Sequence, residues 1–253
     1  MKRPLILISN DDGFSAKGIH FLVDIARRYG DVVVVAPDGA RSGSSLSVTF
    51  SSVVKANLIK EEEGLKVYSC TGTPGDCVKL GIAKFCDRTP DLVLAGINHG
   101  DNSAVNVHYS GTMGVVKEGC LKGISSIGFS HFSHSMETDF NPMKPYIEKI
   151  ISHVLENKLP IGVCLNVNAP DIPKYAGLKV CTMGEGVWQN EWEERISPRG
   201  FTYYWLVGDF KSVDKQDDNT DRNAMKKGYI AVTPVKINVT AFEAINNLSS
   251  LEQ

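Results

Sequence analysis

Two adjacent carboxylates lie near the start of the chain, directly after a short apolar run. The run is Ile6-Leu-Ile8, and the carboxylates are Asp11 and Asp12, followed by Gly13. Neighbouring carboxylates repel each other unless a proton or a cation lies between them, and hard divalent cations prefer oxygen ligands. The pair therefore indicates a divalent metal site. The alternative is a turn in which Asp-Asp-Gly only caps the next helix.

The end of that apolar run indicates where further ligands would lie. A short β-favouring run is typical of a buried strand in a parallel sheet, and ligands bind beyond the carboxyl ends of such strands. Two similar runs, residues 31–36 and 91–97, also end in polar segments. Carboxylate, amide and hydroxyl oxygens suit Mg²⁺ or Mn²⁺, with water completing the coordination. The residues predicted to bind one such cation per subunit are Asp11, Asp12, Ser42 and Asn98.

A second feature, Ser110-Gly-Thr112, lies at the predicted start of a helix that runs through Leu121. Free backbone N–H groups and the helix dipole favour an anion there, and Gly111 lets the backbone approach a phosphate closely. The alternative is an ordinary Ser or Thr helix cap. Together with the metal site, this segment predicts metal-assisted phosphoryl transfer, in which the cation holds a phosphate oxygen and activates a water.

Several other functions are weighed against this prediction. The chain lacks both Gly-x-Gly-x-x-Gly after its first strand and the Gly-x-x-x-x-Gly-Lys-Ser/Thr loop, so dinucleotide binding and Walker-type ATPases lose support. A receiver-like phosphosignalling domain also has an acidic pair after its first strand. It needs a phosphorylatable Asp on a later strand, where this chain has Asn98. A non-catalytic nucleotide-binding oligomer would keep the pocket without turnover.

The composition is that of an ordinary globular protein. The 253 residues are 42% hydrophobic and 22% charged, with a formal net charge of −2, which gives no electrostatic argument for a nucleic-acid polymer or a membrane. No apolar stretch approaches the roughly 18 to 20 residues of a membrane helix. The six cysteines form no Cys-x-x-Cys pair, so we expect reduced, buried thiols. We therefore expect a soluble, cytoplasmic protein.

The pattern of elements predicts an α/β fold with a doubly wound core. Strand-like and helix-like stretches alternate through the first 130 residues, including a helix that begins at Thr73-Pro74. We assign residues 1–177 to the catalytic core and 178–253 to a C-terminal hairpin region packed on it. The polar stretch 214–222 is predicted to be a mobile loop. The hairpin is either an oligomerisation arm or an extra edge hairpin.

Motifs in order along nearly the whole chain resemble those of the SurE family, the survival-protein family of metal-dependent 5′-nucleotidases. From the first half they are Ser9-Asn-Asp-Asp-Gly13, Ala36-Pro-Asp38, Arg41-Ser-Gly43, Gly72-Thr-Pro-Gly-Asp-Cys-Val78, Gly96-Ile-Asn98 and Tyr109-Ser-Gly-Thr112 with Glu118-Gly119. From the second half they are Asn166-Val-Asn-Ala-Pro170, Pro198-Arg-Gly200, Tyr204-Trp205, Thr220-Asp221 and Gly228-Tyr-Ile-Ala-Val-Thr-Pro234. Any one of these motifs is weak, whereas their order along the chain is specific.

The resemblance implies a Rossmann-like three-layer α/β/α core, a C-terminal arm exchanged between subunits, and homodimers or homotetramers. It also implies hydrolysis of nucleoside 5′-monophosphates, with 3′-nucleotides and short polyphosphate as further substrates of some members. The catalytic residues would be Asp11, Asp12 and Asn98, and the metal ligands these three with Ser42. The residues implied to bind phosphate or substrate are Asn10, Asn102, Ser110, Gly111 and Thr112.

The histidines and tryptophans are not assigned to the reaction. His108 falls where the family usually has an apolar residue, and we expect it to pack or face solvent rather than act as a general acid. His99 follows a predicted ligand and would orient its neighbours or simply pack. His131 and His134 lie in a polar stretch without a predicted helix, which is poor evidence for a metal site. The three tryptophans are expected to pack within the hairpin.

Overall fold

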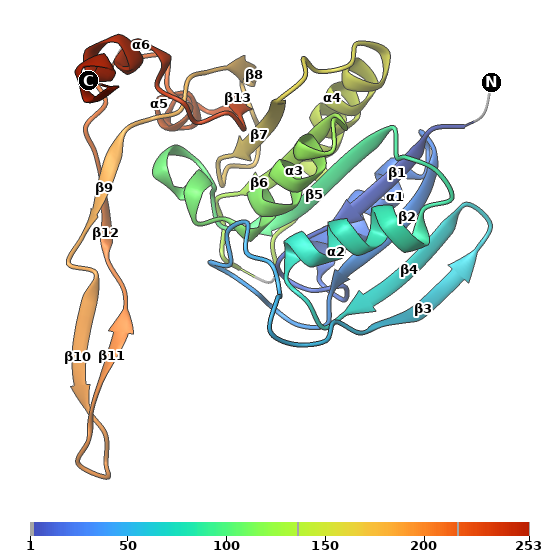
Figure 1. Cartoon of the computed structure of the whole chain (residues 1–253), viewed down its shortest axis with the longest axis horizontal. Helices are drawn as coiled ribbons and strands as arrows, with labels where there is room; N and C mark the ends of the chain where they lie inside the picture. The colour runs from blue at the N-terminus through green and yellow to red at the C-terminus, as the bar shows by residue number, and fades with distance from the viewer. Residues whose placement is uncertain (1–2, 136, 217, 253) are drawn as a thin grey trace.

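A large sheet forms the centre of the molecule, and the computed structural model describes residues 3–135, 137–216 and 218–252 (Figure 1). Within these residues the sheet has nine strands in the order β3-β4-β2-β1-β5-β6-β7-β13-β8. The strands from β4 to β7 in this order are parallel, whereas β3 and β13 pair antiparallel with β4 and β7. The chain winds outward in both directions from β1 and β5, so the crevice between these two strands is the expected ligand site.

The elements of the core alternate as the sequence pattern predicts. The strands of the central sheet are β1 (Leu5–Ser9), β2 (Asp31–Pro37), β3 (Ala56–Glu62), β4 (Leu65–Cys70), β5 (Leu92–His99), β6 (Ser126–His131), β7 (Val163–Ala169), β8 (Gly177–Val180) and β13 (Tyr229–Lys236). The helices are α1 (Lys17–Ala26), α2 (Pro74–Leu80), α3 (Gly111–Leu121), α4 (Lys144–Glu156), α5 (Asp221–Lys226) and α6 (Phe242–Ile245). No helix in the described ranges is long and apolar enough to span a bilayer.

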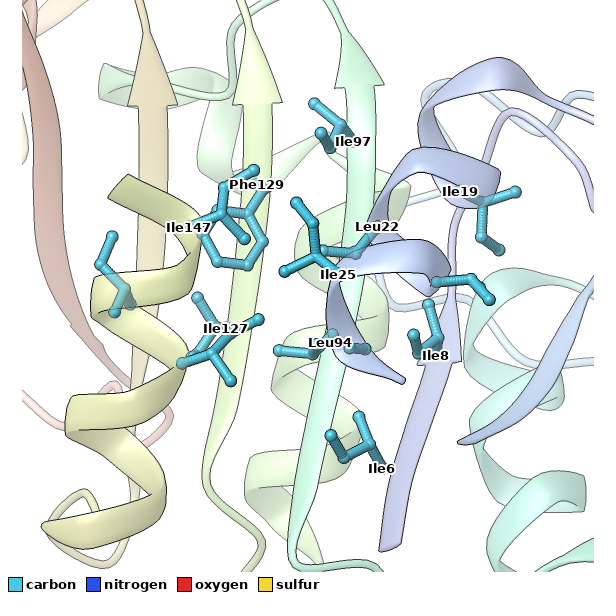
Figure 2. Packing of buried hydrophobic residues seen from close by; sticks show 14 of the residues in the cluster. Ile6, Ile8, Ile19, Leu22, Ile25, Leu94, Ile97, Ile127, Phe129 and Ile147 are labelled. Atoms are coloured by element: carbon cyan, nitrogen blue, oxygen red, sulfur yellow. The ribbon is translucent and has the colours of Figure 1, made fainter. Parts of the chain in front are cut away.

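Helices cover both faces of the sheet, which gives three layers. Alternate residues of a strand point to opposite faces, so Ile6 and Ile8 pack beneath α1 and α4, while Leu7 packs on the opposite side with α2 and α3. Figure 2 shows the first of these layers, where Leu22 of α1 and Ile147 of α4 meet the strands. Burial on both faces explains why the central strands read as continuous apolar runs.

A long β-arm extends away from the core (Figure 1). Its base is the antiparallel pair β9 (Gly186–Gln189) and β12 (Asp209–Ser212), and its outer part is the pair β10 (Trp192–Ile196) and β11 (Thr202–Leu206). The outer part exposes large apolar side chains, among them Trp192, Ile196 and Leu206. Between this arm and the C-terminus, β13 returns to the central sheet, so the sheet contains strands from both predicted regions of the chain.

The predicted α/β class, the three-layer core and the C-terminal hairpin are confirmed. The prediction of a mobile loop over residues 214–222 is wrong for its last residues, because helix α5 begins at Asp221. Residue 217 lies outside the described part of the chain. Thr220 caps α5 by accepting a hydrogen bond from the Asn223 N–H, and Asp221 is the first residue of that helix. Thr220 and Asp221 are both buried. The polar composition of this stretch suggested exposure to solvent, but the Thr220 and Asp221 side chains form hydrogen bonds inside the fold.

The packing of α1 on β5 generates a prediction about stability. A Cβ added to Gly18 would lie 2.1 Å from the carbonyl oxygen of Ile97, so the helix cannot approach the strand as closely with any larger residue. We expect Gly18→Ala to lower the free energy of unfolding by about 2 kcal/mol through overpacking. Gly39→Ala is the matched control, because a Cβ there meets nothing within 4 Å. Chemical denaturation of both variants checks this, and equal stabilities would contradict it.

Candidate metal and phosphate site

A cavity of about 510 Å³ opens at the carboxyl ends of β1 and β5. Of the predicted site residues, Asp11, Ser42, Asn98, Asn102 and Ser110 line it. Other parts of the chain complete its wall, including the arm, which contributes Trp188, Glu191, Leu206 and Val207. The residues predicted from the sequence thus lie at the polar end of this cavity, and none of them comes from the end formed by the arm.

Asp11 is buried at the polar end of the cavity and is 4% exposed. Its Oδ1 accepts a hydrogen bond of 2.5 Å from the Thr112 hydroxyl. Burial, with a smaller contribution from the charge of Asp12, raises the pKa of the Asp11 carboxyl to about 6 against the lowering effect of the Thr112 hydrogen bond. Asp11 is therefore a carboxylate held in a position where its charge is unfavourable unless a cation approaches.

Asp12 is half-buried beside it and reinforces the need for a cation. Its Oδ2 accepts a hydrogen bond of 3.4 Å from the backbone N–H of His99 on β5, which joins the ends of the two central strands. Burial also raises the pKa of the Asp12 carboxyl. The side chain does not line the cavity.

The start of helix α3 packs directly against Asp11. A Cβ on Gly111 would lie 2.6 Å from the Cβ of Asp11 and 2.8 Å from its Oδ2, so only glycine allows this approach. Thr112 is fully buried, and its hydroxyl is used on Asp11. Gly111 and Thr112, predicted to bind phosphate, therefore act on the carboxylate in this structure. The helix terminus and its positive dipole end are nevertheless brought to the cavity.

Ser110 is the N-cap of α3, so the alternative interpretation of this segment as an ordinary helix cap is correct for this residue. Its Oγ accepts a hydrogen bond of 3.0 Å from the Met113 N–H, and the residue also lines the cavity. The cap leaves the N–H groups of the first turn without intrahelical partners, which is the usual basis of an anion site. Both interpretations of Ser110-Gly-Thr112 thus describe the same helix start.

The three predicted asparagines have different positions. Asn10 is buried and exchanges two hydrogen bonds with the backbone of Gly13, so it shapes the loop and does not line the cavity. Asn98 donates its Nδ2–H to the Gly100 carbonyl at 2.7 Å, which leaves Oδ1 as its atom for a cation. Asn102 donates its Nδ2–H to Ser130 Oγ at 2.8 Å and lines the cavity.

The loop that carries Ser42 is fixed to the same groups. The Arg41 N–H donates to the Asp11 carbonyl at 2.7 Å, and the Ser45 N–H donates to the Tyr109 carbonyl at 3.0 Å. The hydroxyl of Ser44 is buried, has no hydrogen-bond partner among the described residues, and lies next to Gly111. Ser44 is thus a residue of the site that is not among those predicted from the sequence. Its only signal is its place in a Gly- and Ser-rich loop.

The donor set fits a hard cation. Within the described ranges no group of three or more His, Cys, Asp or Glu side chains is arranged to hold a metal ion, so a cation here would need neutral oxygens besides the two carboxylates. Neutral oxygens are available from Asn98, Ser42 and Ser44. An orphaned hydroxyl beside two carboxylates of raised pKa is the environment expected where Mg²⁺ or Mn²⁺ binds.

The histidines lie around this site without forming a metal centre. His108 is exposed, as predicted, and its carbonyl accepts a hydrogen bond of 2.6 Å from Ser45 Oγ. Both ring nitrogens of His99 are buried without a hydrogen-bond partner in the described part of the chain. The His131 ring is also buried, and its Nδ1 accepts from the Ser133 N–H at 3.1 Å. His134 is exposed and lines the cavity.

Comparison with known proteins agrees with this geometry. Residues 6–190 match the family described as "Survival protein SurE". A protein of Phocaeicola vulgatus named 5′-nucleotidase SurE is 51% identical over 98% of this chain and 97% of its own length. A protein of Bacteroides thetaiotaomicron with the same name is 52% identical over 98% of this chain and 96% of its own length.

A solved structure gives the same result for the fold. The crystal structure of the SurE protein from Aquifex aeolicus superimposes with a TM-score of 0.85 at 34% sequence identity. The match covers 99% of this chain and 100% of that one. Sequence and fold agree along nearly the whole length, so this chain belongs to the SurE family.

Proposed function

We propose that this protein is a metal-dependent 5′-nucleotidase that hydrolyses nucleoside monophosphates to nucleoside and phosphate. The observation that carries the proposal is the buried Asp11, with the half-buried Asp12 beside it, against the start of α3 at the polar end of a cavity whose other end is largely apolar. Relatives about half identical over nearly their whole length are named 5′-nucleotidase SurE. These names support the reaction class, and the cavity supports the substrate class.

The cation would be held by Asp11, Asp12 and Asn98, with a hydroxyl from Ser42 or Ser44. A divalent cation in this position supplies charge to a phosphate oxygen and lowers the pKa of a bound water. The protein's own part is positional. Thr112 fixes the Asp11 carboxylate through its hydroxyl, and the His99 N–H fixes Asp12. Both hydrogen bonds limit the freedom of the carboxylates before substrate arrives.

The phosphoryl group would lie between the carboxylate pair and the start of α3. The N–H groups at the start of α3 that lack an intrahelical partner, together with the helix dipole, would favour negative charge there. Because the Ser110 cap fixes the first turn of α3, the unpaired N–H groups need no rearrangement as charge grows on the phosphoryl oxygens. This geometry favours in-line attack by water on the phosphorus. Asp11 serves in it as a carboxylate anchor.

The opposite end of the cavity suits a nucleoside. Tyr109 offers an aromatic face, and Trp188, Leu206 and Val207 of the arm offer apolar surface. A volume of about 510 Å³ exceeds what a bare phosphate needs and falls within the range of ordinary ligand pockets. We assign the base and sugar of the substrate to this end of the cavity. We propose 3′-nucleotides and short polyphosphate as further substrates that enter through the same opening.

The apolar arm supports a homo-oligomer. Trp192, Ile196, Trp205 and Leu206 are each more than half exposed, and such a group is more often covered by a partner than left in water. We propose that the region after residue 177 contributes this arm to a second copy of the chain. A dimer or a tetramer built in this way is the expected assembly.

Removing the metal anchor tests the proposed function. We expect Asp11→Asn to lower the turnover of AMP by roughly 10³-fold, because the substitution removes the buried charge that holds the cation. Asp24→Asn, an exposed carboxylate of α1, is the control and should match the wild type. Phosphate release is measured after EDTA treatment and again with Mg²⁺ or Mn²⁺ restored. Near-normal turnover in the folded Asp11→Asn variant would contradict the assignment of Asp11 as a metal ligand.

Removing the aromatic face tests the substrate class. Tyr109→Ala should raise the KM for AMP roughly tenfold through loss of base stacking, and leave the KM for ribose 5-phosphate within about twofold. Phe242→Ala is the matched control, because its ring is 63% exposed against 60% for Tyr109 and lies in α6, away from the cavity. An equal rise for both substrates would assign Tyr109 to the phosphate end instead.

A further inference from the structure

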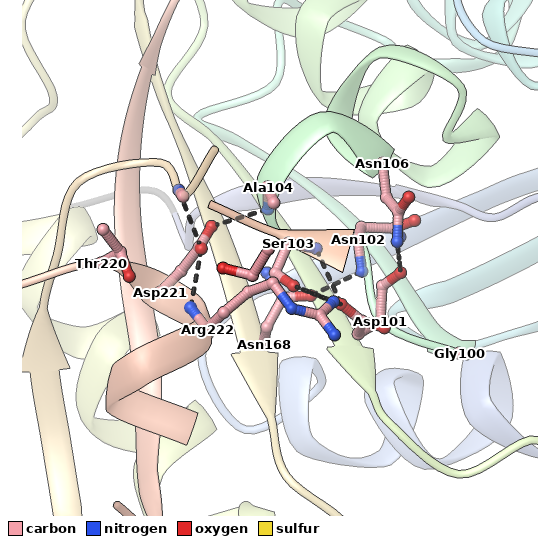
Figure 3. Close-up of polar contacts among 12 residues, drawn as sticks. Gly100, Asp101, Asn102, Ser103, Ala104, Asn106, Asn168, Thr220, Asp221 and Arg222 are labelled. Atoms are coloured by element: carbon pink, nitrogen blue, oxygen red, sulfur yellow. Dashed lines mark hydrogen bonds and ion pairs between the residues drawn. The ribbon is translucent and has the colours of Figure 1, made fainter. Parts of the chain in front are cut away.

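The cavity wall that contains Asn102 and Asn106 belongs to a loop held by residues from helix α5 and from β9 at the base of the arm. We call residues 100–106 the site loop. Figure 3 shows that it faces the start of α5, with Asp221 and Arg222 directed toward it. This contact joins segments more than a hundred residues apart in the sequence.

Asp221 holds the site loop through its carboxylate. The side chain is completely buried, and its Oδ2 accepts a hydrogen bond of 3.0 Å from the Ala104 N–H. Its Oδ1 accepts from the N–H groups of Gly184 at 3.0 Å and Arg222 at 2.7 Å. One carboxylate thus joins the site loop, the entry to the arm at Gly184 and helix α5. Both carboxylate oxygens must accept hydrogen bonds to make these three contacts.

The backbone that Asp221 holds is strained. Ala104 has φ of 49°, in the left-handed region that residues with a side chain seldom adopt. Such a conformation persists only where surrounding contacts impose it. The Asp221–Ala104 hydrogen bond is a contact of this kind, so its loss should let the loop relax.

Arg222 holds the preceding part of the loop. Its Nη1 donates to Asp101 Oδ2 at 3.2 Å, and the Ser103 hydroxyl also donates to that carboxylate oxygen. The Arg222 guanidinium carbon lies 4.3 Å from the centre of the Phe210 ring on β12, so the side chain is held by the arm itself. The ion pair is partly buried and is less screened than one at the surface.

The arm makes one further direct contact with the loop. Trp188 of β9 donates its Nε1–H to Asn106 Oδ1 at 3.0 Å, and its ring packs edge-on against Phe210. On the opposite side the loop is fixed to the core sheet, because the Asn102 N–H donates to Asn168 Oδ1 and its Nδ2–H to Ser130 Oγ. The site loop is therefore held between the sheet and the arm.

We propose that Asp221 and Arg222 are positioning residues for substrate binding, which set the site loop against the nucleoside end of the cavity. The inference rests on the proposed function. Neither residue lines the cavity, so both would act through the site loop. The carboxylate pair and the start of α3 are fixed by other contacts. Gly100, at the root of the loop, is bound through its N–H to the carbonyls of His131 and Ser133. Loss of the positioning contacts should therefore weaken substrate binding and spare the metal site.

Asp221→Asn is the sharpest variant. Asn has the same shape, but its Nδ2–H₂ must replace either Oδ2, which loses the bond from the Ala104 N–H, or Oδ1, which loses the bonds from the Gly184 and Arg222 N–H groups. We expect KM for AMP to rise roughly tenfold, with kcat and the Kd for Mn²⁺ each within about twofold. Asp209→Asn, an exposed carboxylate of β12, is the control and should behave as the wild type.

A second substitution separates positioning from general loss of packing. Ala104→Gly, added to Asp221→Asn, removes the cost of the left-handed backbone and should recover part of the lost affinity. If Asp221→Asn fails to fold, Arg222→Met carries the test, because that side chain is partly exposed and its loss removes the contact to Asp101. The same rise in KM is expected there.

Two results would overturn the proposal. One is a folded variant whose KM stays within about twofold of the wild type. The other is a parallel loss of kcat, substrate affinity and Mn²⁺ affinity with a lower melting temperature and no recovery by Ala104→Gly. The Kd for AMP, measured by calorimetry with Mn²⁺ present, keeps this test separate from the proposed function. Wild-type protein that binds AMP but releases no phosphate would refute only the nucleotidase activity.

Discussion

The burial of two adjacent carboxylates is the constraint on which the rest of the site depends. Asp11 is almost inaccessible, and burial raises its pKa to about 6. In the metal-free protein its ionisation therefore destabilises the fold increasingly as the pH rises from about 4 to about 6. A bound cation would offset this cost. Two neighbouring residues of α3 keep the Asp11 carboxylate in place. Gly111 leaves room for it because it has no side chain, and the Thr112 hydroxyl donates a hydrogen bond to it.

The cavity is assembled from two parts of the molecule with different roles. The core supplies the carboxylate pair, Asn98 and the start of α3, all fixed by the central strands. The arm supplies apolar side chains at the other end, and Trp188 of the arm together with Asp221 and Arg222 of α5 holds the loop between the two ends. Chemistry and substrate recognition are thus attached to separate elements, so changes in the arm can alter specificity without disturbing the carboxylate pair.

The sequence predicts the core well because its signals are local. Continuous apolar runs identify parallel strands buried on both faces, and the polar residue that ends each run marks the crevice, which yields Asp11 and Asn98. The failures concern long-range contacts. Asp221 lies in a polar stretch that reads as a loop, yet it is buried, because N–H groups of Ala104 and Gly184 from distant segments converge on it together with that of the adjacent Arg222. Likewise, no pattern indicates that Trp188 reaches the site loop.

The most direct measurement is a calorimetric titration of Mn²⁺ into the metal-free protein over a range of pH. If the carboxylate pair exists to hold a cation, one Mn²⁺ should bind per chain. Binding should release a proton from Asp11 at pH near or below its pKa of about 6, and none well above it. Asp11→Asn should abolish the proton release and weaken binding. Absence of binding, or equal affinity and proton release in that variant, would contradict a metal site at Asp11 and Asp12.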